Sequence, residues 1–248
     1  MTRAVLGLLV VLCLAVPGVA ADEIFERSVP LAAGGTFMLA NVNGSVHVDG
    51  WDKDMVEIRA LKSARRNAED LGRVQIDVET RPGFVAVRTR YPQHEGVDVA
   101  VDYQVRVPAR VILSSVETVN GTVRVSGVEG SGELRSVNGN VEMFEGLGHF
   151  SARTTNGNVR MELRRLTDSG SLALETVNGS VVLALPAGSQ ADLDVRSLNG
   201  DFFSQLPVTV LVSQGSHGFR GRLGRGGSAV RLRTVNGGIR VIVARPTV

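Results

Sequence analysis

The sequence predicts an all-β fold in which short strands coil around a repeated Asn-Gly turn. Three observations support this: Asn-Gly recurs seven times, alternating apolar residues follow it, and the chain is rich in Gly and Val but only 4% aromatic. A unit that recurs this often is one structural element repeated along the chain. The seven turns are Asn43-Gly44, Asn120-Gly121, Asn138-Gly139, Asn156-Gly157, Asn178-Gly179, Asn199-Gly200 and Asn236-Gly237.

Each repeat has the same internal order. A Ser or Thr stands two residues before the Asn in six of the seven copies, and two alternating apolar residues follow the Gly in six. Alternation along a strand with one buried face places these apolar residues inside and the residues between them outside. We therefore expect Arg124, Glu142 and Arg160 to face outward, and the following residues to be buried: Val123, Val125, Val141, Met143, Val159, Met161, Val181 and Leu183.

Two architectures fit this repeat. Asn-Gly is a strong hairpin signal, so the units could form an antiparallel meander. Alternatively, each unit is one coil of a parallel β-solenoid, with equivalent residues about 4.8 Å apart. Asn120, Asn138 and Asn156 are spaced evenly by 18 residues, which favours the solenoid. In that case the Asn amides can pair along the stack, and the Asn and Gly of each turn tolerate positive φ.

Residues 1–21 have the order of a secretory signal peptide. Arg3 gives a positive start, Ala4 to Val16 is apolar, and small residues follow Pro17-Gly18. The only cysteine, Cys13, lies inside this segment, so the mature chain contains no disulfide and we expect no transmembrane segment in it. We predict export to the periplasm, the cell surface or the medium, followed by a single β-solenoid domain over residues 22–248.

The elements that precede the regular repeats read as strands with one interruption. Residues 37–48 form two short strands around the first turn, and alternation predicts further strands near 56–60, 74–78, 84–90 and 97–107. Residues 61–73 are the helix-like exception. Ser63 could cap a helix that Gly72 ends, so at most one short helix is expected near 63–72.

The last repeat follows a longer gap. Residues 214–228 are crowded with Gly and Arg and predict an irregular loop. Residues 151–248 contain 12 Arg, no Lys and 6 acidic residues, so this half of the chain is basic. Arginine binds phosphate and carboxylate groups bidentately, which makes Arg220, Arg222 and Arg225 the candidate ligand contacts. A plain solvated surface loop is the alternative.

Several stretches resemble the DUF4097 family of adhesin-like proteins. They are AsnValAsnGlySerValHisValAspGlyTrpAsp at 41–52, ValAspTyrGlnValArgValPro at 101–108 and ThrValAsnGlyGlyIleArgVal at 234–241. The resemblance covers nearly all of the mature chain and implies an envelope-facing, right-handed parallel β-helix. The Arg/Gly-rich segment at 214–228 departs from the family pattern.

No catalytic or cofactor motif emerges from the sequence. The four histidines lack metal-ligand spacing, no Ser lies in a Gly-x-Ser-x-Gly elbow, and no acid pair suited to glycoside hydrolysis is evident. We therefore predict no metal, no cofactor and no catalytic residue.

The leading functional prediction is a non-enzymatic interaction module of the cell envelope. Its partners would be an anionic polysaccharide, lipid head groups or a protein, and not nucleic acid, because the chain carries an export signal. The alternatives are a polysaccharide-active enzyme on a β-helix and a structural module that self-associates through its exposed coil ends. The oligomeric state is left open.

Overall fold

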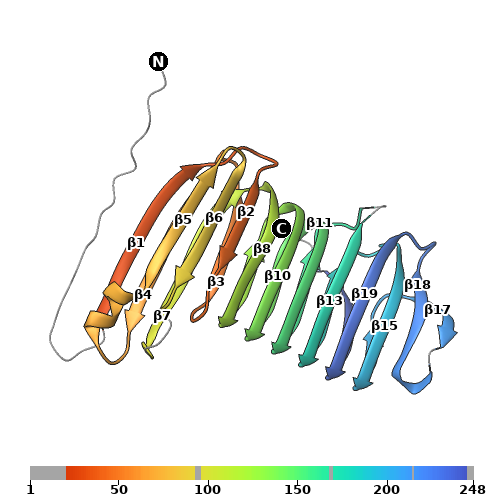
Figure 1. Cartoon of the computed structure of the whole chain (residues 1–248). Helices are drawn as coiled ribbons and strands as arrows, with labels where there is room; N and C mark the ends of the chain where they lie inside the picture. The colour runs from red at the N-terminus through yellow and green to blue at the C-terminus, as the bar shows by residue number, and fades with distance from the viewer. Residues whose placement is uncertain (1–20, 93–95, 168–169, 214, 245–248) are drawn as a thin grey trace.

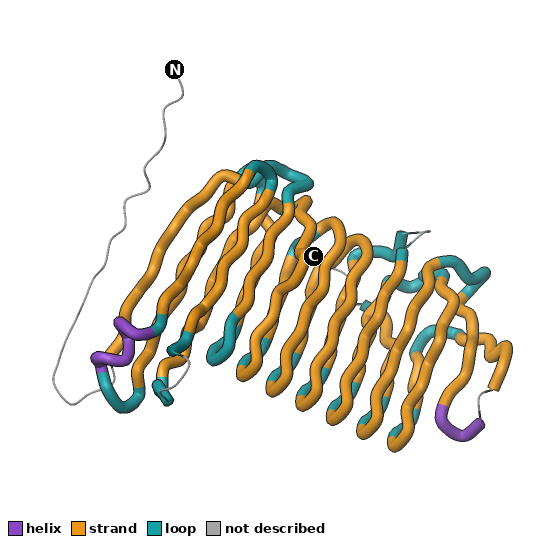
Figure 2. The backbone as a smooth tube through the Cα atoms, viewed as in Figure 1, coloured by secondary structure: helices purple, strands orange, loops and turns teal. Residues whose placement is uncertain are grey.

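The computed structural model describes residues 21–92, 96–167, 170–213 and 215–244. Most of them lie in strands of an elongated β-solenoid whose coils stack side by side (Figures 1 and 2). The solenoid is confirmed over the meander, because Asn120, Asn138 and Asn156 are parallel neighbours on adjacent strands. Residues 1–20 of the predicted signal peptide lie outside the described residues.

Two sheets, A and B, form the opposite walls of the solenoid. In spatial order, sheet A contains β1 (Ala21–Pro30), β4 (Met55–Ala64), β7 (Val99–Pro108), β3 (Val46–Trp51), β9 (Val123–Ser126), the first part of β11 (Val141–Asn156), β12 (Val159–Leu163), β14 (Val181–Leu185), β20 (Ile239–Val243) and β16 (Phe202–Ser204). Sheet B contains β5 (Gln75–Arg81), β6 (Phe84–Arg90), β2 (Thr36–Ala40), β8 (Arg110–Asn120), β10 (Glu129–Asn138), the second part of β11, β13 (Ser171–Asn178), β19 (Ser228–Asn236), β15 (Ala191–Asn199), β18 (Gly218–Leu223) and β17 (Val208–Ser213).

The coils do not stack in the order of the sequence. The coil of residues 36–51 lies between the coils of residues 84–108 and 110–126. At the other end, the last coil, residues 228–243, lies between those of residues 171–185 and 191–204. Strands pair in parallel along the middle of the stack, and antiparallel pairs occur only toward its ends.

The predicted core is confirmed. All eight apolar residues expected inside are buried, and they pack with those of neighbouring coils into one continuous core. On the outer face Arg124 is exposed, whereas Glu142 and Arg160 are partly covered. Arg124 and Glu142 stand on adjacent coils and form an ion pair at 3.4 Å, as their alternating signs predict.

The seven Asn side chains form an unbroken ladder along one corner. Apart from that of Asn43, each amide nitrogen donates to the amide oxygen of the neighbouring Asn on the side toward Asn43, at 2.7–2.9 Å. The ladder runs in the spatial order Asn43, Asn120, Asn138, Asn156, Asn178, Asn236 and Asn199. The predicted pairing of side-chain amides is therefore confirmed.

The Gly of each turn is required by close backbone approach. A Cβ on Gly157 would lie 2.2 Å from the carbonyl oxygen of Gly139, and the other six turns have the same constraint at 2.0–2.2 Å. The turn Asn residues do not use the positive φ that Asn tolerates, because Glu145 is the only non-glycine residue with positive φ among those described. Asn is used for its amide, not for an unusual backbone conformation.

The Ser or Thr before each Asn is buried and bonds to the neighbouring coil. Thr154, for example, donates its hydroxyl to the Gly139 carbonyl oxygen at 2.8 Å. Asn41 takes this position in the first coil and donates to the Val101 carbonyl oxygen. The apolar residue between Ser/Thr and Asn therefore points outward, as Val137 and Val177 do.

The predicted helix is present but starts later and is tighter. Residues Ala68–Arg73 form a single 3-10 helix, η1, whose cap is Asn67. Ser63 does not cap it, because Ser63 and Ala64 extend β4 by pairing with β1 on one side and β7 on the other. A second 3-10 turn, η2, spans Gly215–His217 and was not predicted.

The prediction of an irregular loop at 214–228 is largely wrong. Apart from residue 214, which lies outside the described residues, the segment contains η2, β18 and a turn that leads into β19. Strand β18 forms because Gly221 and Leu223 alternate inward while Arg220 and Arg222 face outward. Both arginines stand opposite aspartates of β15, which favours pairing of the two strands.

Candidate functional site

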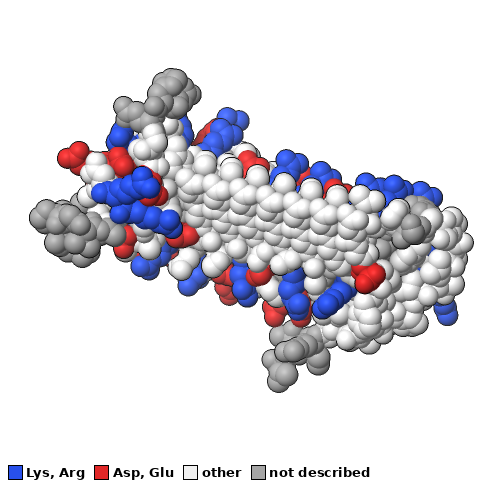
Figure 3. All heavy atoms as spheres, turned by 90° about the horizontal axis from the view of Figure 1, so that it is seen from below, with Lys and Arg blue, Asp and Glu red and all other residues white. Residues whose placement is uncertain are grey.

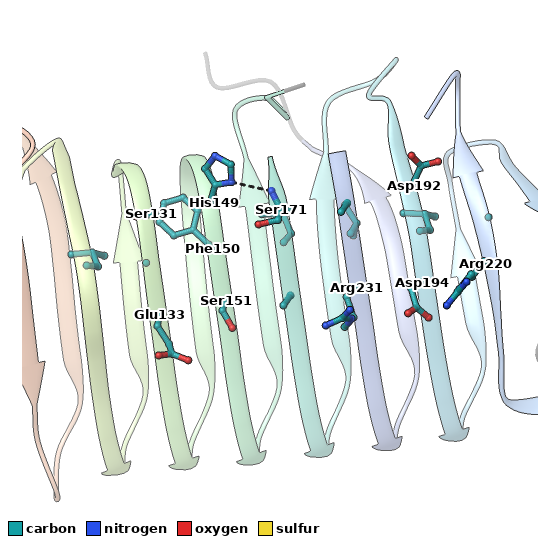
Figure 4. Close-up of a pocket in the computed structure, with 18 of the residues that line it drawn as sticks. Ser131, Glu133, His149, Phe150, Ser151, Ser171, Asp192, Asp194, Arg220 and Arg231 are labelled. Carbon is teal, nitrogen blue, oxygen red and sulfur yellow. Dashed lines mark hydrogen bonds between the residues drawn. The ribbon is translucent and has the colours of Figure 1, made fainter. Parts of the chain in front are cut away.

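A shallow trough crosses the outer face of sheet B (Figure 4). Its volume is about 760 Å³, and it runs perpendicular to the strands from β8 to the β17–β18 hairpin. Ile112 bounds it on the β8 side, and Leu211 and Arg220 bound it on the other. The strand register creates the trough, because it aligns outward residues of adjacent coils into continuous rows.

The floor is low because small residues occupy the middle of two such rows. One row crosses four strands and contains the small residues Ser131, Ser171 and Ala229, with His149 between the two serines. In the neighbouring row, the small residues are Ser151 and Ala173, which lie on adjacent strands. None of these positions follows the Asn-Gly motif directly, so the repeat pattern gave no signal for the trough.

The carboxylates of the trough are already paired. Glu133 forms an ion pair with Arg135, and Asp192 pairs with Arg222 at 3.1 Å. Asp194 lies within ion-pair distance of Arg196 at 3.5 Å and of Arg233 at 3.8 Å, although its Oδ1 has no hydrogen-bond partner among the described residues.

Two guanidinium groups of the trough have no such partner. Within the described part of the chain, neither Arg220 nor Arg231 has a carboxylate within ion-pair distance. They flank Asp194 on the two strands next to β15. The charge still available to a ligand in the trough is therefore positive, although acidic residues also line it.

Uncharged hydrogen-bonding groups lie on the floor. The backbone nitrogen of Ser171 donates to Nδ1 of His149 at 3.2 Å (Figure 4). The hydroxyl of Ser151 is buried and has no hydrogen-bond partner among the described residues. A buried polar atom without a partner costs stability, so its hydrogen-bonding capacity is open to water or a ligand.

The three arginines predicted as ligand contacts have different surroundings. Arg220 lines the trough. Arg222 is on the same face of β18 but is engaged by Asp192, which also accepts a hydrogen bond from the Gly227 backbone nitrogen. Arg225 is exposed in the turn after β18. The structure thus adds Arg231, which lies on the other side of Asp194 from Arg220.

Two further properties of the described residues concern metal binding and membrane spanning. Among them, no group of three or more His, Cys, Asp or Glu side chains is placed to hold a metal ion. Within the same residues, no helix is long and apolar enough to cross a membrane. The Asn residues of the turns face solvent but are engaged with one another in the ladder.

Comparison with known sequences identifies the family. Residues 97–242, more than half of the chain, match the sequence profile of the Toastrack DUF4097 family. The chain belongs to the DUF4097 family. The matched region contains the six turns from Asn120 to Asn236, and thus the part of this DUF4097 protein that carries the trough. No curated protein is significantly similar to the chain.

Solved structures with a similar course of the chain are distant in sequence. One is a proposed cell adhesion protein from Clostridium sporogenes ATCC 15579, at 9% identity over 88% of this chain and 98% of that one, with a TM-score of 0.48. A proposed adhesin from Bacteroides fragilis NCTC 9343 follows at 10% identity, 88% and 96% coverage and a TM-score of 0.43. A proposed lipid binding protein from Parabacteroides distasonis ATCC 8503 has 14% identity, 93% and 96% coverage and a TM-score of 0.42. At these identities and TM-scores, none of the three identifies a ligand.

Proposed function

We propose that this DUF4097 protein is an exported, non-enzymatic binding module of the cell envelope, and that it holds an anionic polysaccharide in the trough of sheet B. The observation that carries the proposal is the unequal pairing of charges there. The carboxylates have cationic partners, whereas Arg220 and Arg231 have none. Guanidinium groups bind carboxylate and phosphate groups bidentately, so an acidic substituent of a polymer is the complementary ligand.

The shape of the trough favours an extended polar chain. It is open to solvent and runs across successive strands, so an extended polymer segment could lie along it. Ser131 and Ser171 offer hydroxyl groups to sugar hydroxyls on the floor. Small residues at the centre let the chain approach the backbone of the sheet. Export, which the order of residues 1–21 supports, would bring the protein to such polymers.

The test is binding of the purified protein to a soluble polyuronate, measured by calorimetry beside neutral dextran and vesicles containing phosphatidylglycerol. Replacing Arg220 and Arg231 together by Ser should weaken polyuronate binding about tenfold or more at low salt, since each charged hydrogen bond contributes roughly 1.5–3 kcal/mol. Arg225→Ala is the matched control, because this arginine lies outside the trough. Ala173→Tyr should also reduce binding by filling the floor without changing charge.

Salt and substrate turnover complete the test. Binding through exposed guanidinium groups should weaken when salt is raised from 0.05 to 0.5 M, because the Debye length then falls below about 10 Å. Equal binding by the double variant, or equal affinity for dextran, would rule out recognition of an acidic group by these arginines. A preference for the vesicles would replace the polymer with a lipid surface. Cleavage of the polymer would make the protein an enzyme and contradict the proposal.

A further inference from the structure

The two sheets end in four edge strands, and one of them differs from the rest. Each edge strand pairs with only one other described strand: β1 and β16 in sheet A, and β5 and β17 in sheet B. An edge exposes unpaired backbone N–H and C=O groups and can add a strand from another chain. Soluble proteins protect such edges with charges or with very short strands.

Three of the edges have this protection. Strand β16 has only three residues. The two edges at the N-terminal end of the solenoid are charged: β5 contains Asp77, Glu79 and Arg81, and β1 contains Asp22, Glu23, Glu26 and Arg27. Head-to-tail addition of a second molecule at that end would therefore place an uncharged strand against a charged one.

Strand β17 has neither form of protection. Its six residues, Val208–Ser213, include no charged side chain. Val210, Leu211 and Val212 are each more than half exposed. The only other large apolar side chains exposed to that extent among the described residues are Leu198 and Phe203, on strands at the same end of the solenoid. Charged atoms crowd the opposite, N-terminal end (Figure 3).

We propose that β17 is a self-association edge, through which two copies of this chain join tail to tail by antiparallel β17–β17 pairing. An uncharged strand can lie against its own copy without like charges facing each other. The pairing has twofold symmetry, so it closes after two copies instead of growing into a filament. It also extends the local arrangement, because β18 is already antiparallel to both of its neighbours, β15 and β17.

The dimer should be weak and reversible. The register of β17 against β18 shifts between Val210 and Val212, so Leu211 interrupts a regular ladder and shortens the segment available for pairing. A contact limited to one six-residue strand is small, and small interfaces belong to weak, transient complexes. Leu211 also borders the trough, so the dimer would place the two troughs on the same face of one continuous sheet. The dimer itself does not depend on what the trough binds.

Sedimentation equilibrium on the purified protein tests the proposal. The wild type should show a monomer–dimer equilibrium at concentrations below about 1 mM, without larger species. Val212→Lys, at an exposed position, should leave the fold intact by circular dichroism and weaken the dimer about tenfold or more, because it places like charges across the new strand pair. Val212→Thr keeps the β-branched shape without charge and should still dimerise.

Two further variants separate this edge from other surfaces. Val177→Lys adds the same charge at an exposed position on the corner away from β17 and should leave the dimer unchanged. Glu79→Lys alters β5 and should also have no effect. A wild type that remains monomeric up to about 1 mM, a dimer that survives Val212→Lys, or one that Glu79→Lys changes equally would each overturn the proposal.

Discussion

At the scale of single residues, the turn glycines are the least replaceable positions of the stack. A Cβ at Gly157 would meet the Gly139 carbonyl oxygen at 2.2 Å, and backbone on both sides leaves no flexible side chain to move aside. We expect Gly157→Ala to lower the free energy of unfolding by about 2–4 kcal/mol in urea denaturation, as overpacking against a rigid backbone does. Gly72→Ala is the control: nothing lies within 4 Å of its Cβ, so a change below about 0.5 kcal/mol is expected.

A second residue-scale prediction concerns two tyrosines near the N-terminal coils. Burial raises the pKa of Tyr91 to about 12, and it raises the pKa of Tyr103 as well. The Tyr103 hydroxyl lies 2.7 Å from the Thr89 hydroxyl, which in turn donates to Asn41. Because the folded protein holds these protons more tightly than an unfolded chain with tyrosine pKa near 10, the free energy of unfolding should fall as pH rises from about 10 to about 12.

Denaturation at a series of pH values measures this effect. Replacing both tyrosines by Phe should remove much of the decline above pH 10, although the double variant loses the Thr89 hydrogen bond and starts from lower stability. An equally steep decline in the double variant would mean that other groups cause it.

At the scale of elements, alternation along each strand decides which substitutions the solenoid tolerates. Val159 is fully buried and pairs with Val141 and Val181 on the adjacent coils. Val159→Asp should destabilise the protein by about 4 kcal/mol or more, because a carboxylate enters the core without a partner. Val177→Asp, at an outward position, should change the thermal midpoint little. An unchanged midpoint for Val159→Asp would contradict the burial of this row.

The same alternation explains why charged residues recur between apolar ones. Outward positions of neighbouring coils are adjacent in space, so opposite charges on successive repeats can pair, as Arg153 does with Glu175 at 3.4 Å. These pairs are solvent-exposed and each contributes at most about 1 kcal/mol. The strands are therefore stabilised mainly by their inner faces and backbone ladders.

At the scale of the whole molecule, the last coil in the sequence connects the coil of residues 191–204 to the rest of the stack. Strand β19 separates β13 from β15 in sheet B. A chain that ends at Gly226 lacks β19 and β20, so β15–β18 lose their connection to the stack. We expect residues 191–223 to lose protection in amide hydrogen exchange, while β8–β13 keep theirs.

A chain that ends at Pro186 is the matched comparison. It lacks the coils of residues 191–204 and 228–243, yet β13 and β14 retain β11 and β12 as partners. Its remaining strands should exchange as slowly as in the full chain. Continued protection of β15–β18 in the chain that ends at Gly226 would show that they can dock on β13 directly. The insertion of β19 between β13 and β15 would then not be needed to hold them.

The sequence by itself determined the coil. The recurring Asn-Gly, the Ser or Thr before it and the alternating apolar pair are local features, and each fixes a turn, a hydrogen bond or an inward side chain within a few residues. The parallel stacking of Asn120, Asn138 and Asn156 and the burial of the Val159 row could therefore be predicted. Ligand contact by Arg220, which lines the trough, stays a prediction. Ser63 as a cap could not, because the pairing of β4 with β1 and β7 overrides that local signal.

Only the tertiary structure decided the order of the coils and the content of the trough. Which strand pairs with which is a choice between segments far apart in sequence, and all coils present similar edges to one another. The insertion of β19 between β13 and β15 places Arg231 between Ala173 and Asp194, in the row that also contains Ser151. The trough results from the register of eight strands, and no stretch of the sequence contains more than two of its floor residues.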